Sequence, residues 1–300
     1  MTYKDHYDLI VIGSGPGGRR AAIQAAKFGK NVLVVESGKR VGGVSVHTGT
    51  IPSKTLRETS LNLSGWRERE FYGRSYRVKQ NITADDLKKR LHMTLDHEVE
   101  VLEHQFARNS VHTLHGMACF QDSYTLKVIS GEDEELVVSS DKFIIATGSK
   151  PYRPGFVPFD GVSIFDSDEI LNMKRAPKSI AVIGGGVIGV EYATIFSALD
   201  IPVTLIESRD TILDFVDQEI IATLLHELRD RGVVLRLGTA IEEITRVKNG
   251  RCKITLKSGR LVRSDMVLFA AGRYGATGEL GLKDVGIVPD DRGRLSVDDK

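Results

Sequence analysis

Two glycine-rich segments have the spacing that the phosphates of a dinucleotide require. One runs from Gly13 to Gly18 and the other from Gly184 to Gly189, each with the pattern G-x-G-x-x-G. Each follows a short apolar run and opens a segment of helical character. The glycines allow a tight turn and the close approach of a pyrophosphate, and the helix N-terminus offers it free N–H groups. We therefore predict two dinucleotide sites in one chain, which suit electron exchange between a tightly held flavin and a diffusing nicotinamide.

An acidic residue follows each motif at the same distance. Glu36 lies 18 residues after Gly18, and Glu207 lies 18 residues after Gly189. A carboxylate at the end of the second strand of a βαβ unit accepts hydrogen bonds from ribose hydroxyls and repels a 2′-phosphate, so Glu207 favours NAD. Arg209 is either a partner for a 2′-phosphate or a solvated surface arginine. The use of both NAD(H) and NADP(H) therefore stays open.

A third glycine-rich segment, Val41–Lys54, joins the first βαβ unit to a predicted helix and contains no cysteine. It ends in Pro52-Ser53-Lys54, and the second motif leads into Glu191. Lysine in a loop and glutamate in a helix are usually solvated. If the two nucleotide-binding halves face each other, however, Lys54 and Glu191 can pair between the cofactors. A cation there would favour an anionic reduced flavin.

Apolar runs around both motifs predict the elements that position them. The predicted strand–helix–strand units are 7–12, 19–28 and 31–36 in the first half, and 179–183, 190–199 and 203–207 in the second. Each half continues through a helix and a three-stranded meander to a strand that ends in a small residue and glycine. The pattern predicts an α/β protein with two Rossmann-like domains.

Composition excludes several classes of protein. A formal charge of +1 gives no reason to expect a nucleic-acid partner. Cys119 and Cys252 are isolated, and no histidine has a metal-binding spacing, so neither a disulfide framework nor a metal site is predicted. No run reaches the roughly 18 apolar residues of a membrane span, and no apolar leader is present, so we expect a cytoplasmic protein. His47 lies in the cysteine-free segment without a defined role.

Together these residues resemble the flavoprotein disulfide reductase family of the class I pyridine nucleotide-disulfide oxidoreductases. The resemblance rests on Gly13–Gly18, Gly42-Gly43 with Gly49–Lys54, Ala146–Gly148, Gly184–Glu191 and Ala271–Arg273. In that family two cysteines five residues apart form a redox disulfide beside the flavin. This chain has Ser45 and Thr50 at those positions, so the thiol relay is missing while both nucleotide motifs remain.

The resemblance implies FAD at the first site, with NAD(H) and NADP(H) taking turns at the second. The implied reaction is NADPH + NAD⁺ ⇌ NADP⁺ + NADH, a ping-pong hydride transfer through bound flavin that needs orientation and charge but no protein nucleophile. The alternatives are an NAD(P)H oxidase, a quinone-type reductase or a dihydrolipoamide-dehydrogenase-like protein without its disulfide. A non-enzymatic alternative is a nucleotide-binding regulator.

The resemblance also assigns site residues. Lys54 and Glu191 are the implied pair between the cofactors, and Val187 stands where several relatives place a gating tyrosine. The implied residues of the FAD site are Gly13, Gly15, Pro16, Gly17, Gly18, Glu36, Ser37, Gly38, Lys39, Arg40, Val41, Gly42, Gly43, Val44, Ser45, Ser53, Lys54, Gly116, Ala118, Thr147 and Gly148. Those of the nicotinamide nucleotide site are Gly184, Gly186, Val187, Ile188, Gly189, Glu207, Arg209 and Gly272.

The same likeness implies an α/β fold with two nested three-layer Rossmann-like FAD/NAD(P)-binding domains, and it divides the chain into three parts. Residues 1–150 are the implied first segment of the FAD-binding domain, 151–275 an inserted NAD(P)-binding domain, and 276–300 the start of the return to the FAD domain. Members of the family continue beyond this point into a second FAD segment and a dimerisation domain. We therefore expect the 300 residues to be a fragment of a protein that forms a homo-oligomer when complete.

Overall fold

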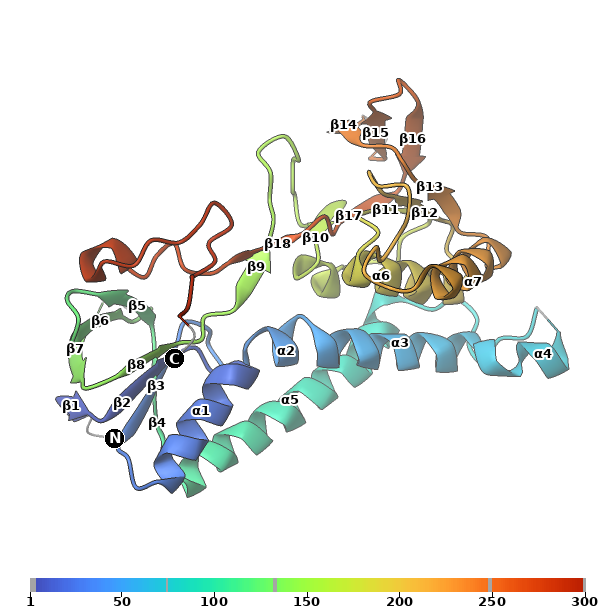
Figure 1. Ribbon diagram of the computed structural model, residues 1–300. Coiled ribbons are helices and arrows are strands. Elements are labelled where there is room, and N and C mark those ends of the chain that lie inside the picture. The colour runs from blue at the N-terminus through green and yellow to red at the C-terminus, as the bar shows by residue number, and fades with distance from the viewer. Residues whose placement is uncertain (1–3, 74, 132–133, 248–249, 299–300) are drawn as a thin grey trace. The chain divides into compact units, whose positions relative to one another are not determined.

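The computed structural model describes residues 4–73, 75–131, 134–247 and 250–298. The chain forms two compact units, and Figure 1 shows the order of their elements. The first unit comprises Met1–Ile51, Thr94–Lys150 and Arg273–Lys300, and the second comprises Pro52–Met93 and Pro151–Gly272. Both contain parallel sheets with helices, so the predicted α/β class is confirmed. The nucleotide-domain bounds at residues 150 and 275 stay a prediction.

The first unit is built on a parallel four-stranded sheet in the order β4-β3-β2-β8. Its strands are β2 (Leu9–Ile12), β3 (Val32–Glu36), β4 (His112–His115) and β8 (Phe143–Ile145). The central strands β2 and β3 are buried along their whole length. Such strands read as continuous apolar runs because both faces of a parallel sheet are covered.

Side-chain alternation sends the residues of each central strand to two different cores. Leu9 and Val11 of β2 face the helices α1 (Pro16–Lys27) and α5 (Ala84–Arg108), in a cluster that also contains Ala22 and Phe106. Ile10 and Ile12 face the opposite side, as the period of two in a strand requires. One strand therefore joins both layers.

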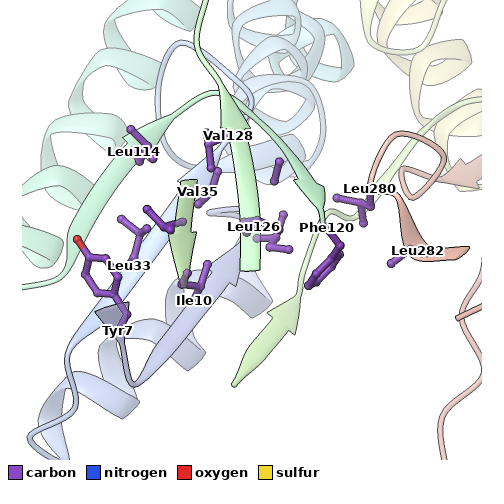
Figure 2. Packing of buried hydrophobic residues seen from close by; sticks show 13 residues of the cluster. Tyr7, Ile10, Leu33, Val35, Leu114, Phe120, Leu126, Val128, Leu280 and Leu282 are labelled. Carbon is purple, nitrogen blue, oxygen red and sulfur yellow. The ribbon is translucent and has the colours of Figure 1, made fainter. Parts of the chain in front are cut away.

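The second face of this sheet is covered by another four-stranded sheet, in the order β1-β7-β6-β5. Its members are β1 (His6–Tyr7), β5 (Met117–Phe120), β6 (Thr125–Ile129) and β7 (Glu135–Ser140). Figure 2 shows how Leu126 and Val128 of β6 approach Ile10, Leu33 and Val35 of the parallel sheet. Leu280 and Leu282, at the start of the 3₁₀ helix η3 (Leu282–Val285), complete this core from the end of the chain.

The glycine-rich segment after β3 is more regular than the sequence indicated. Gly42 and Gly43 have positive φ angles of 123° and 60°, and then α2 (Gly43–His47) and α3 (Thr50–Ser64) follow with a short break between them. The polar stretch from residue 65 contains η1 (Trp66–Glu68) and α4 (Arg69–Tyr72). The helix expected after the glycine-rich segment is confirmed as α3, although it begins at Thr50, whereas α2 and the short helices from Trp66 to Tyr72 were not expected. Tertiary contacts stabilise such short helices where local propensity does not predict them.

The second unit repeats the plan with a parallel sheet in the order β10-β17-β11-β12-β13. The strands are β10 (Ile164–Asp166), β11 (Ile180–Ile183), β12 (Val203–Ile206), β13 (Val234–Arg236) and β17 (Met266–Phe269), and the helices are α6 (Val187–Ala198) and α7 (Gln218–Asp230). Helix α6 packs against β11 and β12. It is buried on most sides, which explains its nearly continuous apolar sequence.

An antiparallel sheet covers the other face of this parallel sheet. It consists of β14 (Ile241–Arg246), β15 (Cys252–Leu256) and β16 (Leu261–Ser264), and its buried residues meet Ala181, Ile183 and Phe269. A two-stranded ladder of β9 (Ser149–Pro151) and β18 (Arg273–Gly275) stands where the chain crosses between the units.

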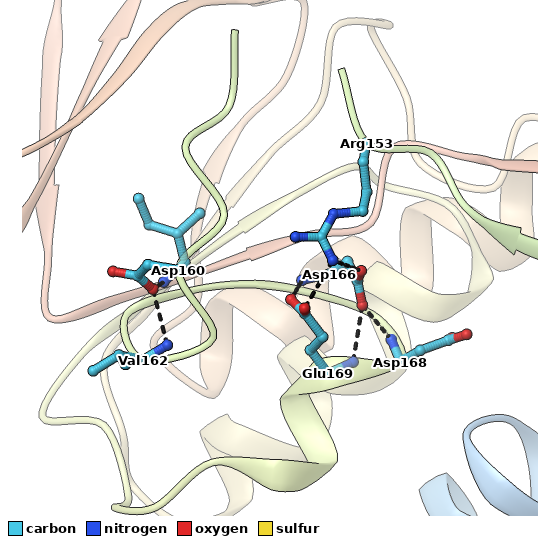
Figure 3. A network of polar contacts seen from close by, with 7 residues as sticks. Arg153, Asp160, Val162, Asp166, Asp168 and Glu169 are labelled. Atoms are coloured by element: carbon cyan, nitrogen blue, oxygen red, sulfur yellow. Dashed lines mark hydrogen bonds and ion pairs between the residues drawn. The ribbon is translucent and has the colours of Figure 1, made fainter. Parts of the chain in front are cut away.

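A charged network fixes the entry to this unit, as Figure 3 shows. Arg153 Nη1 lies 3.0 Å from Asp166 Oδ2 and 2.7 Å from Glu169 Oε1. Asp166 Oδ1 in turn accepts hydrogen bonds from the backbone N–H groups of Asp168 and Glu169, at the start of η2 (Glu169–Asn172). The buried Asp166 is therefore satisfied on both oxygens, as a buried charge must be.

Gly18 packs so closely against the backbone of the first unit that an added side chain would clash, so we expect the fold to depend on this glycine. A Cβ atom on Gly18 would lie 1.9 Å from the carbonyl oxygen of Gly13, whereas a Cβ on Gly17 would meet nothing within 4 Å. We expect Gly18→Ala to lower the free energy of unfolding by about 1–3 kcal/mol, since the helix must shift away from the strand. Urea denaturation of the ligand-free protein measures the change.

Gly17→Ala is the matched control, because it adds the same methyl group to the same helix without a clash. It should unfold at the same urea concentration as the unaltered protein or at a slightly higher one. Equal losses for both variants would show that backbone freedom, and not the close approach at Gly18, is what this turn requires.

Candidate functional site

The first glycine motif forms the turn between β2 and α1. Gly13 has a φ angle of 104°, a conformation that favours glycine, and helix α1 begins at Pro16 with Gly15 as its N-cap. No side chain caps this helix. Its first N–H groups therefore point out of the loop as donors for an anion.

A buried carboxylate holds this loop in shape. Glu36 Oε2 accepts a hydrogen bond from the backbone N–H of Ser14 at 2.9 Å and another from its hydroxyl at 2.5 Å. The hydroxyl oxygen of Ser14 accepts the backbone N–H of Gly42 at 2.8 Å, and Glu36 Oε1 accepts that of Gly38 at 2.8 Å. One acid thus ties the glycine loop to the segment that follows β3.

A cavity of about 610 Å³ opens beside this network in the first unit. The predicted residues that line it are Gly13, Gly15, Pro16, Gly17, Glu36, Ser37, Gly43, Val44, Gly116, Ala118, Thr147 and Gly148. A Cβ added to Gly15 or Gly17 would enter open space, so the glycines leave room for a ligand that a side chain would take. The volume, the free N–H donors and the acid at one end fit an adenine dinucleotide.

Other residues predicted for this site stand outside the cavity wall. Gly18 lies beneath the turn, where it allows the helix to approach the strand. Gly38, Lys39, Arg40, Val41, Gly42 and Ser45 do not line the cavity, although Gly38 and Gly42 hold the network that shapes it. Arg40 instead forms an ion pair with Asp96, in which Nη1 lies 2.6 Å from Oδ1. Ser53 and Lys54 belong to the second unit.

The wall also contains residues that were not assigned to the site. Ser14 and Ala146 belong to the motifs Gly13–Gly18 and Ala146–Gly148. The others are Ile12, Val35, Met117, Ser149, Lys150, Ala276, Gly278, Glu279 and Leu280. The four from Ala276 onward reach the cavity because the backbone N–H of Ala276 donates to the carbonyl of Gly148 at 3.0 Å. No local motif marks them. In the sequence, only the predicted return of the chain to the first domain after residue 275 indicated that these residues could reach the cavity.

The second glycine motif repeats the geometry of the first. Gly184 has a φ angle of 110°, and a Cβ on Gly189 would lie 1.9 Å from the Gly184 carbonyl oxygen. The buried Glu207 accepts the backbone N–H of Gly185 on Oε2 at 2.6 Å. Of the flanking residues, Val187 is exposed and Ile188 is half-buried on the first turn of α6. Gly272 follows Ala271, whose Cα would lie 3.1 Å from a Cβ on Gly184, and it accepts the backbone N–H of Tyr152 through its carbonyl oxygen at 3.0 Å.

Arg209 contacts the acid of this second motif. Its Nε lies 3.1 Å from Glu207 Oε1 and its Nη2 lies 3.1 Å from Oε2. Burial by itself would raise the pKa of Glu207. Hydrogen bonds from Arg209 and from the backbone N–H of Gly185 outweigh that effect and lower the pKa to about 2. Glu207 is therefore ionised throughout the physiological range.

Lys54 and Glu191 are in contact within the second unit. Lys54 Nζ bonds Glu191 Oε1, although the lysine side chain is 60% exposed and the glutamate side chain is 16% exposed. Glu191 sits in the second turn of α6, and Lys54 sits in the second turn of α3. The pair therefore joins the beginnings of two helices.

A second set of ion pairs connects the same part of the chain to the end of α6. Asp200, just after that helix, accepts Arg69 Nη1 and Nη2 at 2.9 Å each and Arg77 Nη2 at 2.5 Å. The planar fork of Arg69 matches the carboxylate with two parallel bonds. Helix α6 is thus tied to residues 52–93 at both of its ends.

No thiol takes part in these contacts. Cys252 is buried, and burial raises the pKa of its thiol to about 11, while Cys119 is half-buried in β5 and both cysteines are free. Ser45 Oγ donates to the carbonyl of Gly42 at 3.3 Å. His47 Nε2 lies 2.9 Å from the carbonyl oxygen of Val41, so its ring supports the same segment.

Among residues 4–73, 75–131, 134–247 and 250–298, no cluster of three or more histidine, cysteine or acidic residues could hold a metal ion. In the same part of the chain, none of the helices has the length and apolarity needed to cross a membrane.

Several curated proteins are similar to this chain over nearly its whole length. The soluble pyridine nucleotide transhydrogenase of Mycobacterium bovis (strain BCG / Pasteur 1173P2) is 47% identical over 297 residues, which cover 98% of this chain and 63% of that protein. The protein of the same name from Chromohalobacter salexigens is 40% identical over 294 residues, with the same coverage. This chain therefore spans about 63% of the length of these relatives.

Solved structures share the fold. LpdA from Mycobacterium tuberculosis superposes with a TM-score of 0.88 at 25% identity, covering 97% of this chain and 64% of that one. The Cu(II) complex of the HOCl-induced flavoprotein disulfide reductase RclA from Escherichia coli gives 0.85 at 27% identity, covering 98% and 63%. A family model for pyridine nucleotide-disulphide oxidoreductases matches residues 7–300. With two acid-anchored glycine loops in place, the chain belongs to the pyridine nucleotide-disulphide oxidoreductase family.

Proposed function

We propose that this chain forms the nucleotide-binding part of a soluble transhydrogenase that transfers a hydride between NADPH and NAD⁺ with FAD as its cofactor. One observation carries the proposal. Each unit holds a glycine loop anchored by a buried glutamate, yet the segment that should carry a redox disulfide has Ser45 and Thr50 instead. The 47% identity to a protein named for this activity supports the same reading.

The residues of the first unit supply what an FAD site requires. The uncapped start of α1 offers N–H donors to the pyrophosphate, and Glu36 offers acceptors to the ribose. The backbone around Gly116 and Ala118 provides a wall for the adenosine end. When bound, FAD supplies a carrier that accepts and returns two electrons. The protein's task is to hold and orient it.

The second unit supplies a site for nicotinamide nucleotides that come and go. The loop around Gly184 to Gly189 presents the start of α6 to a pyrophosphate, and the ionised Glu207 accepts hydrogen bonds from a ribose. Arg209 beside it offers a positive charge to a 2′-phosphate. Both nucleotides can therefore use one site, which an exchange between them requires.

Lys54 is proposed to stabilise negative charge on the reduced flavin, and Glu191 to hold Lys54 in position. The contact between them supports this pairing, and the ties from Asp200 to Arg69 and Arg77 fix the segment that carries Lys54. A preorganised cation aimed at developing charge contributes more than one that must reorient.

The electron acceptor, the location and the oligomeric state are separate parts of the proposal. An oxidase or quinone-type reductase would use the same two nucleotide sites, so the electron acceptor decides between the activities. A cytoplasmic location and a homo-oligomeric state of the complete protein stay predictions.

Substituting the acid in each unit should separate the two sites. Glu36→Gln places an amide where two N–H groups now donate, so we expect FAD affinity to fall at least about tenfold. Glu207→Gln is the matched control, because it makes the same change in the second loop. It should retain flavin and weaken ADP-ribose binding.

Flavin absorbance per protein after gel filtration measures the first effect, and calorimetry with ADP-ribose measures the second. Loss of flavin from both variants, or from neither, would contradict the assignment of one site to each unit.

The activity itself can be measured with NADPH and a thio-NAD⁺ acceptor. We expect reduction of thio-NAD⁺ without oxygen uptake, and the Cys119→Ser/Cys252→Ser double variant should keep most of this rate because no thiol carries electrons. Oxygen uptake that accounts for the NADPH consumed, with no thio-NADH formed, would establish the oxidase alternative instead.

Lys54→Met removes the proposed cation while keeping a long side chain. We expect flavin reduction by NADPH to slow by about tenfold, because charge on the reduced ring loses a partner, while NADPH affinity changes little. Stopped-flow absorbance separates the two parameters.

Lys89→Met, at an exposed position on α5, is the control for the loss of one surface charge. Reduction at the same rate in the Lys54 and Lys89 variants would remove Lys54 from the mechanism.

A further inference from the structure

We propose that Asp214 is a latch on Arg209 and that this latch sets how the second site ranks NADP(H) against NAD(H). The inference rests on the proposed function and deepens it, because it names the residue that biases the choice between the two substrates. Asp214 is a positioning residue here, since it acts through Arg209.

The guanidinium of Arg209 is divided between two carboxylates. Its Nε and Nη2 each lie 3.1 Å from an oxygen of Glu207, and its Nη1 lies 2.6 Å from Asp214 Oδ1. All three nitrogens therefore have an acidic partner. The fork that could bind a phosphate with two parallel bonds is engaged on both edges.

This arrangement suits a nucleotide with a free 2′-hydroxyl. One of the donors to Glu207 is the hydroxyl of the exposed residue Ser208, at 3.1 Å from Oε1. A ribose hydroxyl can replace that donor without any movement of Arg209. A 2′-phosphate would bring between one and two negative charges beside Glu207, so it needs the guanidinium of Arg209 to turn toward it. For NADP(H), at least one carboxylate contact of Arg209 must therefore break.

The contact with Asp214 is the weaker of the two. Both of its partners are close to half exposed, at 44% for Arg209 and 49% for Asp214, and an exposed ion pair changes an equilibrium by about fivefold at most. Glu207 is buried and also accepts the backbone N–H groups of Gly185 and Arg209, so it does not depend on the guanidinium alone. A weak latch allows both nucleotides to bind.

The backbone fixes the place of Asp214 relative to the glycine loop. The N–H of the preceding residue, Leu213, donates to the carbonyl of Gly185 at 2.9 Å, and Leu213 has a φ angle of 46°. A branched side chain adopts that angle only when its surroundings hold it there. Asp214 thus projects from a segment that is fastened to the same loop as Glu207.

The test compares ligands that differ only by the 2′-phosphate and do not require flavin. For Asp214→Asn, we expect calorimetry to give about three- to fivefold tighter binding of 2′-phospho-ADP-ribose, with ADP-ribose within about twofold of the unaltered protein. The KM for NADPH should fall in parallel, while kcat with saturating NADPH stays the same. Thermal unfolding confirms that the variant is folded.

Asp210→Asn is the matched control. It removes the same charge from the same segment, and among the described contacts Asp210 approaches Gly238 and not Arg209. It should shift the ratio of the two affinities less than Asp214→Asn does. In the background of Arg209→Ala, which should itself weaken 2′-phospho-ADP-ribose, Asp214→Asn should have no further effect beyond that of Asp210→Asn.

Equal shifts for the Asp214 and Asp210 variants, or the same shift in the absence of Arg209, would reduce the effect to general electrostatics and overturn the latch. If the unaltered protein binds neither ligand, the proposed nucleotide site is wrong, and the proposed role of Asp214 is wrong as well. The binding of ADP-ribose to the unaltered protein therefore distinguishes the two failures.

Discussion

A buried carboxylate at the end of a parallel strand fixes each nucleotide loop, and the candidate sites depend on it. Glu36 and Glu207 are 8% and 5% exposed, and each accepts the N–H of the residue that follows the first glycine of its loop, Ser14 or Gly185. A buried charge that loses its hydrogen bonds is costly. A change in the shape of the loop would break these hydrogen bonds, so the loop keeps its conformation and its N–H donors stay aligned for a ligand.

The two copies of this arrangement differ in the residues that bond the acid, with a functional consequence. In the first, the hydroxyl of Ser14 donates to Glu36 and accepts from Gly42, so the acid is linked to the segment after β3 by a chain of neutral partners. In the second, the corresponding residue is Gly185 and a charged arginine occupies the space beside the acid. The first arrangement suits a resident ligand, and the second suits ligands of different charge.

The ties around α6 serve a related purpose in the second unit. Glu191 bonds Lys54 near the start of the helix, and Asp200 holds Arg69 and Arg77 just beyond its end. A single pair at an exposed site would contribute little, whereas several charges with a bidentate arginine form a network that restricts geometry. In the proposed hydride transfer, which has no redox cysteines to rely on, such electrostatic positioning is the means by which the protein would assist.

The sequence by itself determined the α/β class, the two glycine motifs and the acids Glu36 and Glu207, because these follow from local spacing. A strand buried on both faces must be apolar, a tight turn needs glycine at Gly13, and an acid placed 18 residues after the motif falls at the next strand end. The absence of cysteine from the segment 41–54 is likewise a property of the sequence alone.

Only the tertiary structure decided the rest. It decided that the glycine-rich segment after β3 forms α2, that residues from Ala276 onward line the cavity, and that Arg209 bonds both Glu207 and Asp214. These features depend on contacts between side chains far apart in the sequence or on short helices stabilised by packing. Neither periodicity nor spacing encodes such contacts, because local propensity is a weak term that tertiary packing overrides.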